Sequence, residues 1–312
     1  MTNLLVVFGA TGQQGSSVIS KVLEDAELSK AYKVRGLTRD PLKPNAQALV
    51  KRGVEVARCD TDDPASVKAV LQGAHTVFAM TVSLYKPGGM EQELAQGKAL
   101  ADEALAAGVK FLVYSSVPSP KKISGGRYPV DSFDVKDKVR EYISSLPIKS
   151  AFFLPGSFMQ NFHTNMAPRP GPDGNPTFWG FVSPETKFPL IEIAGDTGKF
   201  VGSILAEPDK YAGKALACST RCYTMTEMAE IMARSSGKKI TYAQIPKDVF
   251  AGFLPEASRP TLLNMLSYFE EFGYYGPETE QLVKEAAQTA KGAPTEFEEY
   301  LKREPLQLRA TQ

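Results

Sequence analysis

A glycine-rich turn near the amino terminus constrains the fold of this chain more than any other feature. Residues 9–15 read GATGQQG and lie between an apolar run, residues 4–8, and a segment with one apolar helical face, residues 14–25. In such a turn the first glycine permits the tight bend, the second lets backbone N–H groups approach a pyrophosphate, and the third lets helix and strand pack closely. The helix N-terminus adds hydrogen-bond donors and partial positive charge. The pattern predicts a dinucleotide-binding unit, and the alternative is a plain strand–helix turn.

The first half of the chain alternates short apolar runs with helical patterns, which is typical of βαβ units on a parallel sheet. Strands are predicted at residues 4–8, 33–38, 54–60, 76–81, 110–115 and 150–154. Helices are predicted at residues 14–25, 44–52, 64–72, 91–107 and 134–145, with Asp63 as the N-cap of the third. The expected fold class is α/β, a doubly wound parallel (Rossmann) sheet formed by residues 1–155.

Beyond Pro155 the regular alternation ends, and residues 156–312 predict a smaller, mostly helical lobe that belongs to the same structural unit. Strands are expected at residues 188–194 and 239–245, and helices at residues 196–205, 247–254 and 260–272. Asp196 is the expected N-cap of the first of these helices. Thr224 and Glu227 have the spacing of a capping box and predict a further helix that ends at Gly237. We expect this lobe to cover the carboxyl ends of the sheet and to hold a substrate or partner.

Charge and composition exclude several classes of function. The 36 basic and 35 acidic residues give a net charge of +1, which provides no basic footprint for nucleic acid. Three cysteines without a C-x-x-C pair favour free thiols in a reducing compartment, and two distant histidines predict no metal site. The apolar run at residues 4–8 is too short for a signal sequence or a membrane span. We therefore expect a soluble protein of the cytoplasm, with the nucleus as a second compartment.

The end of the second predicted strand favours NADP(H) over NAD(H). Folds that bind NAD usually place an acidic residue there for the ribose 2′-hydroxyl, whereas this chain has Arg39, followed by Lys43. A guanidinium can pair with a 2′-phosphate and stack on the adenine. The neighbouring Asp40 argues for NAD(H) instead. The alternative to a phosphate-binding role is that Arg39 and Lys43 are simply solvated. Asp60, at the end of the third strand, is a candidate partner for the adenine amino group or an N-cap of a local turn.

With these residues located, the chain resembles the NmrA-like family, an atypical branch of the short-chain dehydrogenases/reductases. The matching stretches run from residue 1 to about 235 and are GATGQQG (9–15), LTRD (37–40), FLVYSSV (111–117), SFDVKDKVREY (132–142), FFLPGSFMQNF (152–162), DTGKFV (196–201) and YTMTEMAEI (223–231). The resemblance implies binding of NADP(H) or NAD(P) at the glycine loop. It also implies one of two roles, a reductase of secondary metabolism or a redox-sensing regulator that binds a transcription factor or another protein.

The resemblance assigns the family lysine to Lys136, but no Tyr-x-x-x-Lys occurs anywhere in this chain. The position of the tyrosine, which acts as general acid in the classical members, is taken by Ser132. A serine hydroxyl is a poor acid near neutral pH, so ordinary ketone reduction is in doubt. Lys136 keeps the role of holding the nicotinamide ribose hydroxyls, and a solvated helix lysine is its alternative. Isoflavone-reductase-like relatives work with a lysine and no tyrosine, which keeps an enzyme open.

The complete set of predicted site residues comes from the strand ends and from the matching stretches. Lys136 is the one catalytic candidate. The predicted cofactor-binding residues are Gly9, Thr11, Gly12, Gln13, Gln14, Gly15, Arg39, Lys43, Asp60, Thr81, Ser115, Lys136, Pro155, Phe158 and Asn161. A substrate pocket is predicted from Ser132, His163, Trp179 and Tyr223, with Phe181 and Phe269 as further aromatic walls. The alternative is that the aromatic residues belong to the core and that His163 is a surface or polar-core residue.

Two functions follow from this set. The first is an NADP(H)-dependent oxidoreductase of the atypical short-chain type, acting on a hydrophobic or aromatic small molecule. The second is a non-catalytic sensor of the NADPH/NADP ratio, in which cofactor occupancy orders a loop such as residues 83–90 for a protein partner. The absent tyrosine favours the sensor, whereas Lys136 and the aromatic lobe favour the enzyme, to which the sequence leans. A purely structural role conflicts with the intact glycine loop.

Overall fold

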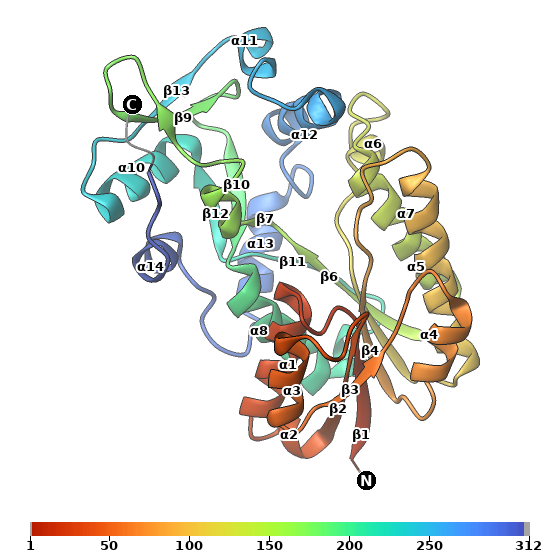
Figure 1. Ribbon diagram of the computed structural model, residues 1–312. Helices are drawn as coiled ribbons and strands as arrows, with labels where there is room; N and C mark the ends of the chain where they lie inside the picture. Colours follow the sequence, from red (N-terminus) through yellow and green to blue (C-terminus); the bar gives the residue numbers. More distant parts are fainter. Residues whose placement is uncertain (1, 309–312) are drawn as a thin grey trace.

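The computed structural model of the chain describes residues 2–308. Its centre is a seven-stranded sheet with the order β11-β6-β5-β4-β1-β2-β3, in which every neighbouring pair is parallel (Figure 1). The strands are β1 (Asn3–Val7), β2 (Tyr32–Thr38), β3 (Glu55–Arg58), β4 (Thr76–Met80), β5 (Phe111–Ser115), β6 (Lys149–Pro155) and β11 (Ala215–Cys218). The prediction of a doubly wound parallel sheet is confirmed, with the addition of β11 from the second half of the chain.

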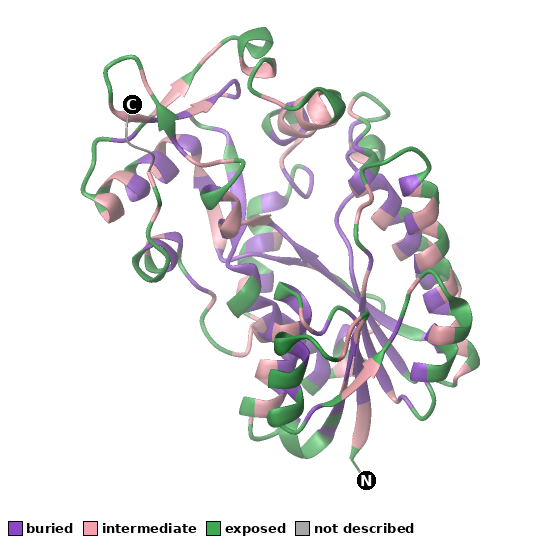
Figure 2. Cartoon of the chain, in the orientation of Figure 1, coloured by how far each residue is buried: buried purple, intermediate pink, exposed green. Residues whose placement is uncertain are grey.

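Helices cover both faces of this sheet. One face carries α1 (Gln13–Glu24), α2 (Leu28–Ala31), α3 (Pro44–Lys51) and α8 (Ile193–Ala206), and the other carries α4 (Pro64–Val70), α5 (Gly89–Ala106) and α7 (Asp131–Ser145) (Figure 1). The short helix α6 (Pro120–Ile123) lies beyond the carboxyl edge of the sheet, next to α7. Alternate residues of β1 enter different cores, since Leu5 and Val7 pack beside α1 and α8 while Val6 packs on the opposite face. Figure 2 shows the central strands of the sheet buried between the helices. Burial on both faces explains why β1 is apolar without alternation.

The strand order reverses beside β1, because its neighbours are β4 on one side and β2 on the other. Crossover connections from β1 and β4 leave the sheet toward opposite faces, so a crevice opens above the carboxyl ends of these two strands. The glycine turn at residues 9–15 follows β1 directly and therefore lies at this crevice. The topology thus fixes where a ligand of this sheet would bind.

The rest of the chain forms a lobe above the carboxyl edge of the sheet (Figure 1). Two small three-stranded sheets build it, with the orders β12-β10-β7 and β13-β9-β8. Its strands are β7 (Ser157–Phe158), β8 (Arg169–Pro170), β9 (Pro176–Gly180), β10 (Lys187–Ile191), β12 (Arg221–Thr224) and β13 (Thr241–Gln244). Its helices are η1 (Met159–His163), α10 (Met225–Ser236), α11 (Lys247–Ala251), η2 (Glu256–Ser258), α12 (Arg259–Phe272), α13 (Thr279–Ala287) and α14 (Phe297–Arg303). The short helix α9 (Pro208–Tyr211) lies instead beside the start of β6, where Asp209 pairs with Lys149 over 2.7 Å.

The lobe is joined to the first half by shared elements rather than by a linker. Strand β11 extends the main sheet beside β6, and α8 packs on α1, where the Gly198 amide donates to the Ser17 hydroxyl over 2.9 Å. A Cβ atom at Gly198 would lie 2.3 Å from the Ser17 carbonyl oxygen. The helix that begins at the glycine turn is thus held from behind by an element of the second half.

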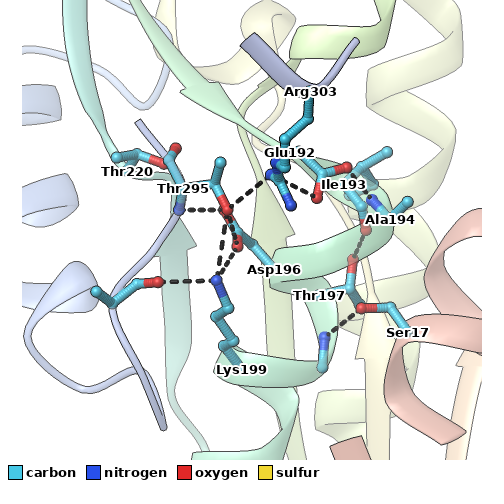
Figure 3. A network of polar contacts seen from close by, with 12 residues as sticks. Ser17, Glu192, Ile193, Ala194, Asp196, Thr197, Lys199, Thr220, Thr295 and Arg303 are labelled. Atoms are coloured by element: carbon cyan, nitrogen blue, oxygen red, sulfur yellow. Dashed lines mark hydrogen bonds and ion pairs between the residues drawn. The ribbon is translucent and has the colours of Figure 1, made fainter. Parts of the chain in front are cut away.

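The prediction that Asp196 is the N-cap of α8 was wrong. Glu192 caps the helix by accepting from the Ala194 amide over 3.1 Å, and α8 begins before Asp196. The fully buried Asp196 instead accepts from the amide and hydroxyl of Thr295, over 2.9 and 3.0 Å, and pairs with Lys199 over 2.7 Å (Figure 3). This network fastens the C-terminal segment to α8, which sequence spacing alone does not reveal. The predicted Thr224 cap of α10 is confirmed, since its hydroxyl accepts from the Glu227 amide over 3.0 Å.

Candidate functional site

The glycine turn forms an anion-binding end on α1. Gly9 has a φ of +63°, and a Cβ atom at Gly15 would lie 2.3 Å from the Gly9 carbonyl oxygen, so both positions require glycine. Gly12 is the N-cap of α1, and in the described structure no side chain caps the helix and no acidic residue occupies its first turn. The first turn therefore offers unpaired N–H donors at the positive end of the helix dipole. This geometry fits a phosphate group.

Two cationic side chains, those of Arg39 and Lys43, lie beside this turn, just after β2. Arg39 and Lys43 are exposed, and neither side chain has a hydrogen bond or ion pair within residues 2–308. The carboxylate of Asp40 is already used locally, because it accepts from the Leu42 amide over 3.0 Å. The Ala10 amide donates to the Leu37 carbonyl over 3.1 Å, which ties the glycine turn to the end of β2. The two cations are free to bind an anion at this corner.

Asp60 lies at the end of β3 in a local turn. Its carboxylate accepts from the Asp62 amide over 3.1 Å, which is the turn-capping role given above as one of its two alternatives. Asp62, which the sequence reasoning missed, accepts from Gln92 and Gln96 over 2.6 Å each. These hydrogen bonds, followed by the positive charges of Lys86 and Arg39, lower the pKa of the Asp62 carboxyl. Asp62 thus links the corner near Arg39 to the start of α5.

Lys136 lies in a cluster of buried polar groups at the carboxyl end of β4. Its ammonium pairs with the carboxylate of Glu93, whose side chain is 0% exposed, and donates to the Thr81 carbonyl oxygen over 2.9 Å. The Thr81 hydroxyl donates to Glu93 over 2.7 Å and lies 2.8 Å from the Tyr114 hydroxyl. Lys136 itself keeps 18% of its side chain exposed. The cluster therefore holds one partly accessible ammonium in a fixed position.

Burial governs the titration of this cluster. Desolvation lowers the pKa of the Lys136 ammonium, and the Glu93 carboxylate opposes that shift through its charge and hydrogen bond. Desolvation also raises the pKa of the Tyr114 hydroxyl well above its ordinary value, so this phenol stays neutral and acts only as a hydrogen-bonding group. Lys136 is the member of the cluster that can meet a ligand as a charged group.

Close packing of α5 against α7 brings Glu93 to Lys136. A Cβ atom at Gly97 would lie 2.5 Å from a methyl carbon of Val139, so glycine at this position sets the approach of the two helices. Glu93 and Gly97 are four residues apart on α5, and Lys136 and Val139 are three residues apart on α7. Each pair therefore lies on one face of its helix. The sequence reasoning missed Glu93. Its signal is a charged residue in the stripe of small buried residues formed by Gly97, Ala101 and Ala104.

The segment after β6 runs along the same edge. Pro155 is the last residue of β6, and its carbonyl oxygen accepts from the Tyr274 hydroxyl over 3.2 Å. Phe158 belongs to β7 and is half-buried, and Asn161 belongs to η1. Ser115 ends β5 and is buried, as is Ser132 on α7. Thr81 directly follows β4, whereas Ser115 and Pro155 are the last residues of β5 and β6, so all three lie at one edge of the sheet.

An apolar pocket adjoins this edge within the lobe. It has a volume of about 160 Å³, and its lining includes Ser157 and Asn161 together with Trp179, Phe181 and Phe269. Of the residues predicted for a substrate pocket, Trp179, Phe181 and Phe269 line this pocket. Tyr223 is fully buried elsewhere, where its hydroxyl donates to Glu296 over 2.7 Å, and the exposed His163 packs edge-on against Tyr300. Neither they nor Ser132 line the pocket.

Two other kinds of site are absent from the described part of the chain. Within residues 2–308, no three His, Cys, Asp or Glu side chains gather in a group that suits a metal ion. Each described helix is too short or too polar to cross a lipid bilayer.

Comparisons with known proteins agree with this geometry. The sequence profile of the NmrA-like family matches residues 1–301. An NmrA-like family domain-containing protein of Dictyostelium discoideum is 29% identical, over 97% of this chain and 98% of its own. The NmrA-like family domain-containing oxidoreductase FrzB of Cladobotryum is 28% identical, over 78% of this chain and 77% of its own.

Solved structures show the same fold. The structure of NmrA, a negative transcriptional regulator, in complex with NADP has a TM-score of 0.80 and 24% identity, covering 96% of this chain and 94% of its own. NmrA has also been solved in complex with NAD. An NADPH-dependent quinone oxidoreductase of Escherichia coli, complexed with NADPH, has a TM-score of 0.75 and 21% identity, covering 96% and 99% of the two chains.

Proposed function

The chain belongs to the NmrA-like family, and from that premise we propose that it binds NADP(H) above β1 and β4 and acts as an oxidoreductase on a small apolar or aromatic molecule. Curated relatives such as FrzB are described as oxidoreductases, and the related folds include one complexed with NADPH. The observation that carries the proposal is the position of Lys136. Its ammonium is fixed by Glu93 and Thr81 at the edge where the glycine turn and the apolar pocket also lie.

Each part of the dinucleotide has matching residues in this proposal. The pyrophosphate would lie at the N-terminus of α1, near the backbone of Gln13 and Gln14, where the turn leaves donors free. Thr81 and Ser115 would border the nicotinamide end, with Pro155, Phe158 and Asn161 passing beside it. When bound, the cofactor would supply or accept a hydride. Lys136 would donate hydrogen bonds to the ribose hydroxyls and orient the reacting ring toward the pocket.

Arg39 and Lys43 would select NADP(H) by pairing with the 2′-phosphate. We expect Arg39→Ala to weaken NADPH binding by about 1–3 kcal/mol, the range for loss of a charge-assisted contact. Fluorescence titrations of NADPH and NADH on both proteins measure this, and NADH, which lacks the phosphate, should bind both equally. Arg234→Ala, on the exposed side of α10, is the matched control. Equal affinity of the wild type for NADPH and NADH, unchanged in Arg39→Ala, would refute the assignment.

An assay of NADPH oxidation tests the enzymatic half of the proposal. We expect the wild-type protein to oxidise NADPH in the presence of single-ring quinones or aromatic aldehydes, and Lys136→Arg to retain more of this activity than Lys136→Met. An arginine keeps the positive charge and hydrogen-bond donors at the nicotinamide edge, whereas methionine removes both. NADPH binding without reduction of any of these acceptors contradicts the enzyme.

A regulator is the second candidate, and the loop after β4 favours it. Val82 is 63% exposed and Tyr85 is 74% exposed, so two large apolar side chains stand in water beside the proposed cofactor site. Gly88, with a φ of +71°, precedes the start of α5. Exposed apolar residues often mark a surface for a protein partner. Limited proteolysis of this loop should then slow on addition of NADPH but not of NADP⁺, and equal rates with both would exclude a ratio sensor.

A further inference from the structure

The apolar pocket has the size and lining of a site for one aromatic ring. Its volume of about 160 Å³ is close to the roughly 150 Å³ of a protein cavity that accepts benzene. Phenylalanine, tryptophan, leucine and methionine side chains form most of its wall. Phe188 and Phe269 meet edge-on there, with their ring centroids 5.3 Å apart. Such walls favour a flat apolar body over a sugar or a charged chain.

Arg169 is the one charged residue among those that line this pocket. Its guanidinium carbon lies 5.5 Å from the ring centroid of Phe253, which in turn packs edge-on against Trp179 at 6.3 Å. All three residues line the pocket, and Phe253 is 40% exposed, so this stack stands where the pocket meets solvent. The aromatic contact holds the guanidinium in place without using its N–H donors.

Arg169 has no acidic partner in the described structure. Within residues 2–308 its side chain makes no hydrogen bond or ion pair, and no acidic residue lines the pocket. Asp173, in the following turn, is already engaged, because its carboxylate accepts from Asn175 over 2.8 Å and lies 3.7 Å from Lys239. A guanidinium beside an aromatic pocket with its donors free is suited to a carboxylate from a ligand.

We propose that the pocket takes a small aromatic molecule that carries a carboxylate or a similar anionic group, with Arg169 binding the anion. This ligand class deepens the proposed function and rests on it, because it specifies the substrate of the same site. The ring would be buried among the phenylalanines, and the anion would stay at the solvent side, paired with the guanidinium. Ser157, Asn161 and Asn165 are the uncharged polar residues of the lining, and the first two lie beside the proposed nicotinamide end.

Trp179, the single tryptophan of the chain, reports binding directly because it lines the pocket. Benzoate and benzamide form a matched pair of probes, since they share the ring and differ in charge. We expect benzoate to bind the wild type about tenfold more tightly than benzamide, which corresponds to about 1.4 kcal/mol. In Arg169→Gln this preference should vanish while benzamide binding stays unchanged, and Arg169→Lys should keep part of it. Arg234→Gln is the control and should behave as the wild type.

The outcomes separate this inference from the proposed function. A preference for benzoate that survives in Arg169→Gln, or equal binding of both probes to the wild type, overturns the role of Arg169. Failure of both probes to change Trp179 fluorescence overturns the pocket as an aromatic site. None of these results changes the outcome of the NADPH titrations. Conversely, if the protein does not bind NADPH, the binding of benzoate and benzamide can still be measured in the protein without cofactor.

Discussion

Gly15→Val is expected to abolish NADPH binding and to lower the free energy of unfolding by about 1–3 kcal/mol, the usual cost of overpacking. A Cβ atom at this position would lie 2.3 Å from the Gly9 carbonyl oxygen and 3.0 Å from the Ala10 Cα, both of which are backbone atoms. The strand and the first turn of α1 must then move apart, which displaces the N–H donors. Fluorescence titration with NADPH and urea unfolding measure the two effects.

Gly12→Ala provides the comparison for this experiment. Its Cβ would lie 3.3 Å from the Gly9 carbonyl oxygen, so the fold should tolerate it with a small change in stability. The added methyl would still stand where the backbone approaches a pyrophosphate, and NADPH binding should fall. If Gly15→Val has the same free energy of unfolding and the same affinity for NADPH as the wild type, the close contact at Gly15 is not needed for the fold or for binding.

The second large effect is expected on the free energy of unfolding when either member of the Lys136–Glu93 pair is replaced. Glu93→Leu leaves the ammonium buried without its carboxylate, and Lys136→Met leaves a carboxylate that is 0% exposed without its cation. We expect each single variant to lose about 3–5 kcal/mol of stability, since a buried charge without a partner is strongly destabilising. The double variant should recover most of this loss, because it buries no charge. Urea unfolding of the four proteins measures the coupling as a double-mutant cycle.

Glu93→Gln is the conservative control for this cycle. The amide has the size of the carboxylate and can still accept a hydrogen bond from Lys136, but it lacks the charge that opposes the lowered pKa of the ammonium. Its stability should therefore lie between that of the wild type and Glu93→Leu. Additive losses in the double variant would show that the two residues act independently, and the fixed ammonium of the proposed site would have no basis.

Local patterns predicted the sheet and the glycine turn because both depend on neighbouring residues. The apolar strands, the spacing of the three glycines and the Asp63 cap of α4 are each contained in a few consecutive positions, and the structure confirms them. The extra strand β11 was not predicted, because its four residues, Ala215–Cys218, are too few to show a periodic pattern.

The polar cluster around Lys136 shows why the site was only partly predictable. Lys136 was found through its place in a recognised motif, but Glu93 lies 43 positions away in sequence and meets it through packing of α5 on α7. The pocket combines residues from β9, α11 and α12, whose relative positions depend on the whole lobe. Tyr223 was placed in the pocket by its residue type, and His163 by its type and its position near the expected substrate side. The structure shows both side chains elsewhere.

A crystal structure of the wild-type protein with NADPH tests the central proposal most directly. We expect the pyrophosphate at the N-terminus of α1, the 2′-phosphate within reach of Arg39, and Lys136 Nζ on the nicotinamide ribose. The nicotinamide ring should face the pocket that contains Trp179. A dinucleotide bound elsewhere, or bound at the glycine turn with its nicotinamide away from Lys136, would contradict the account.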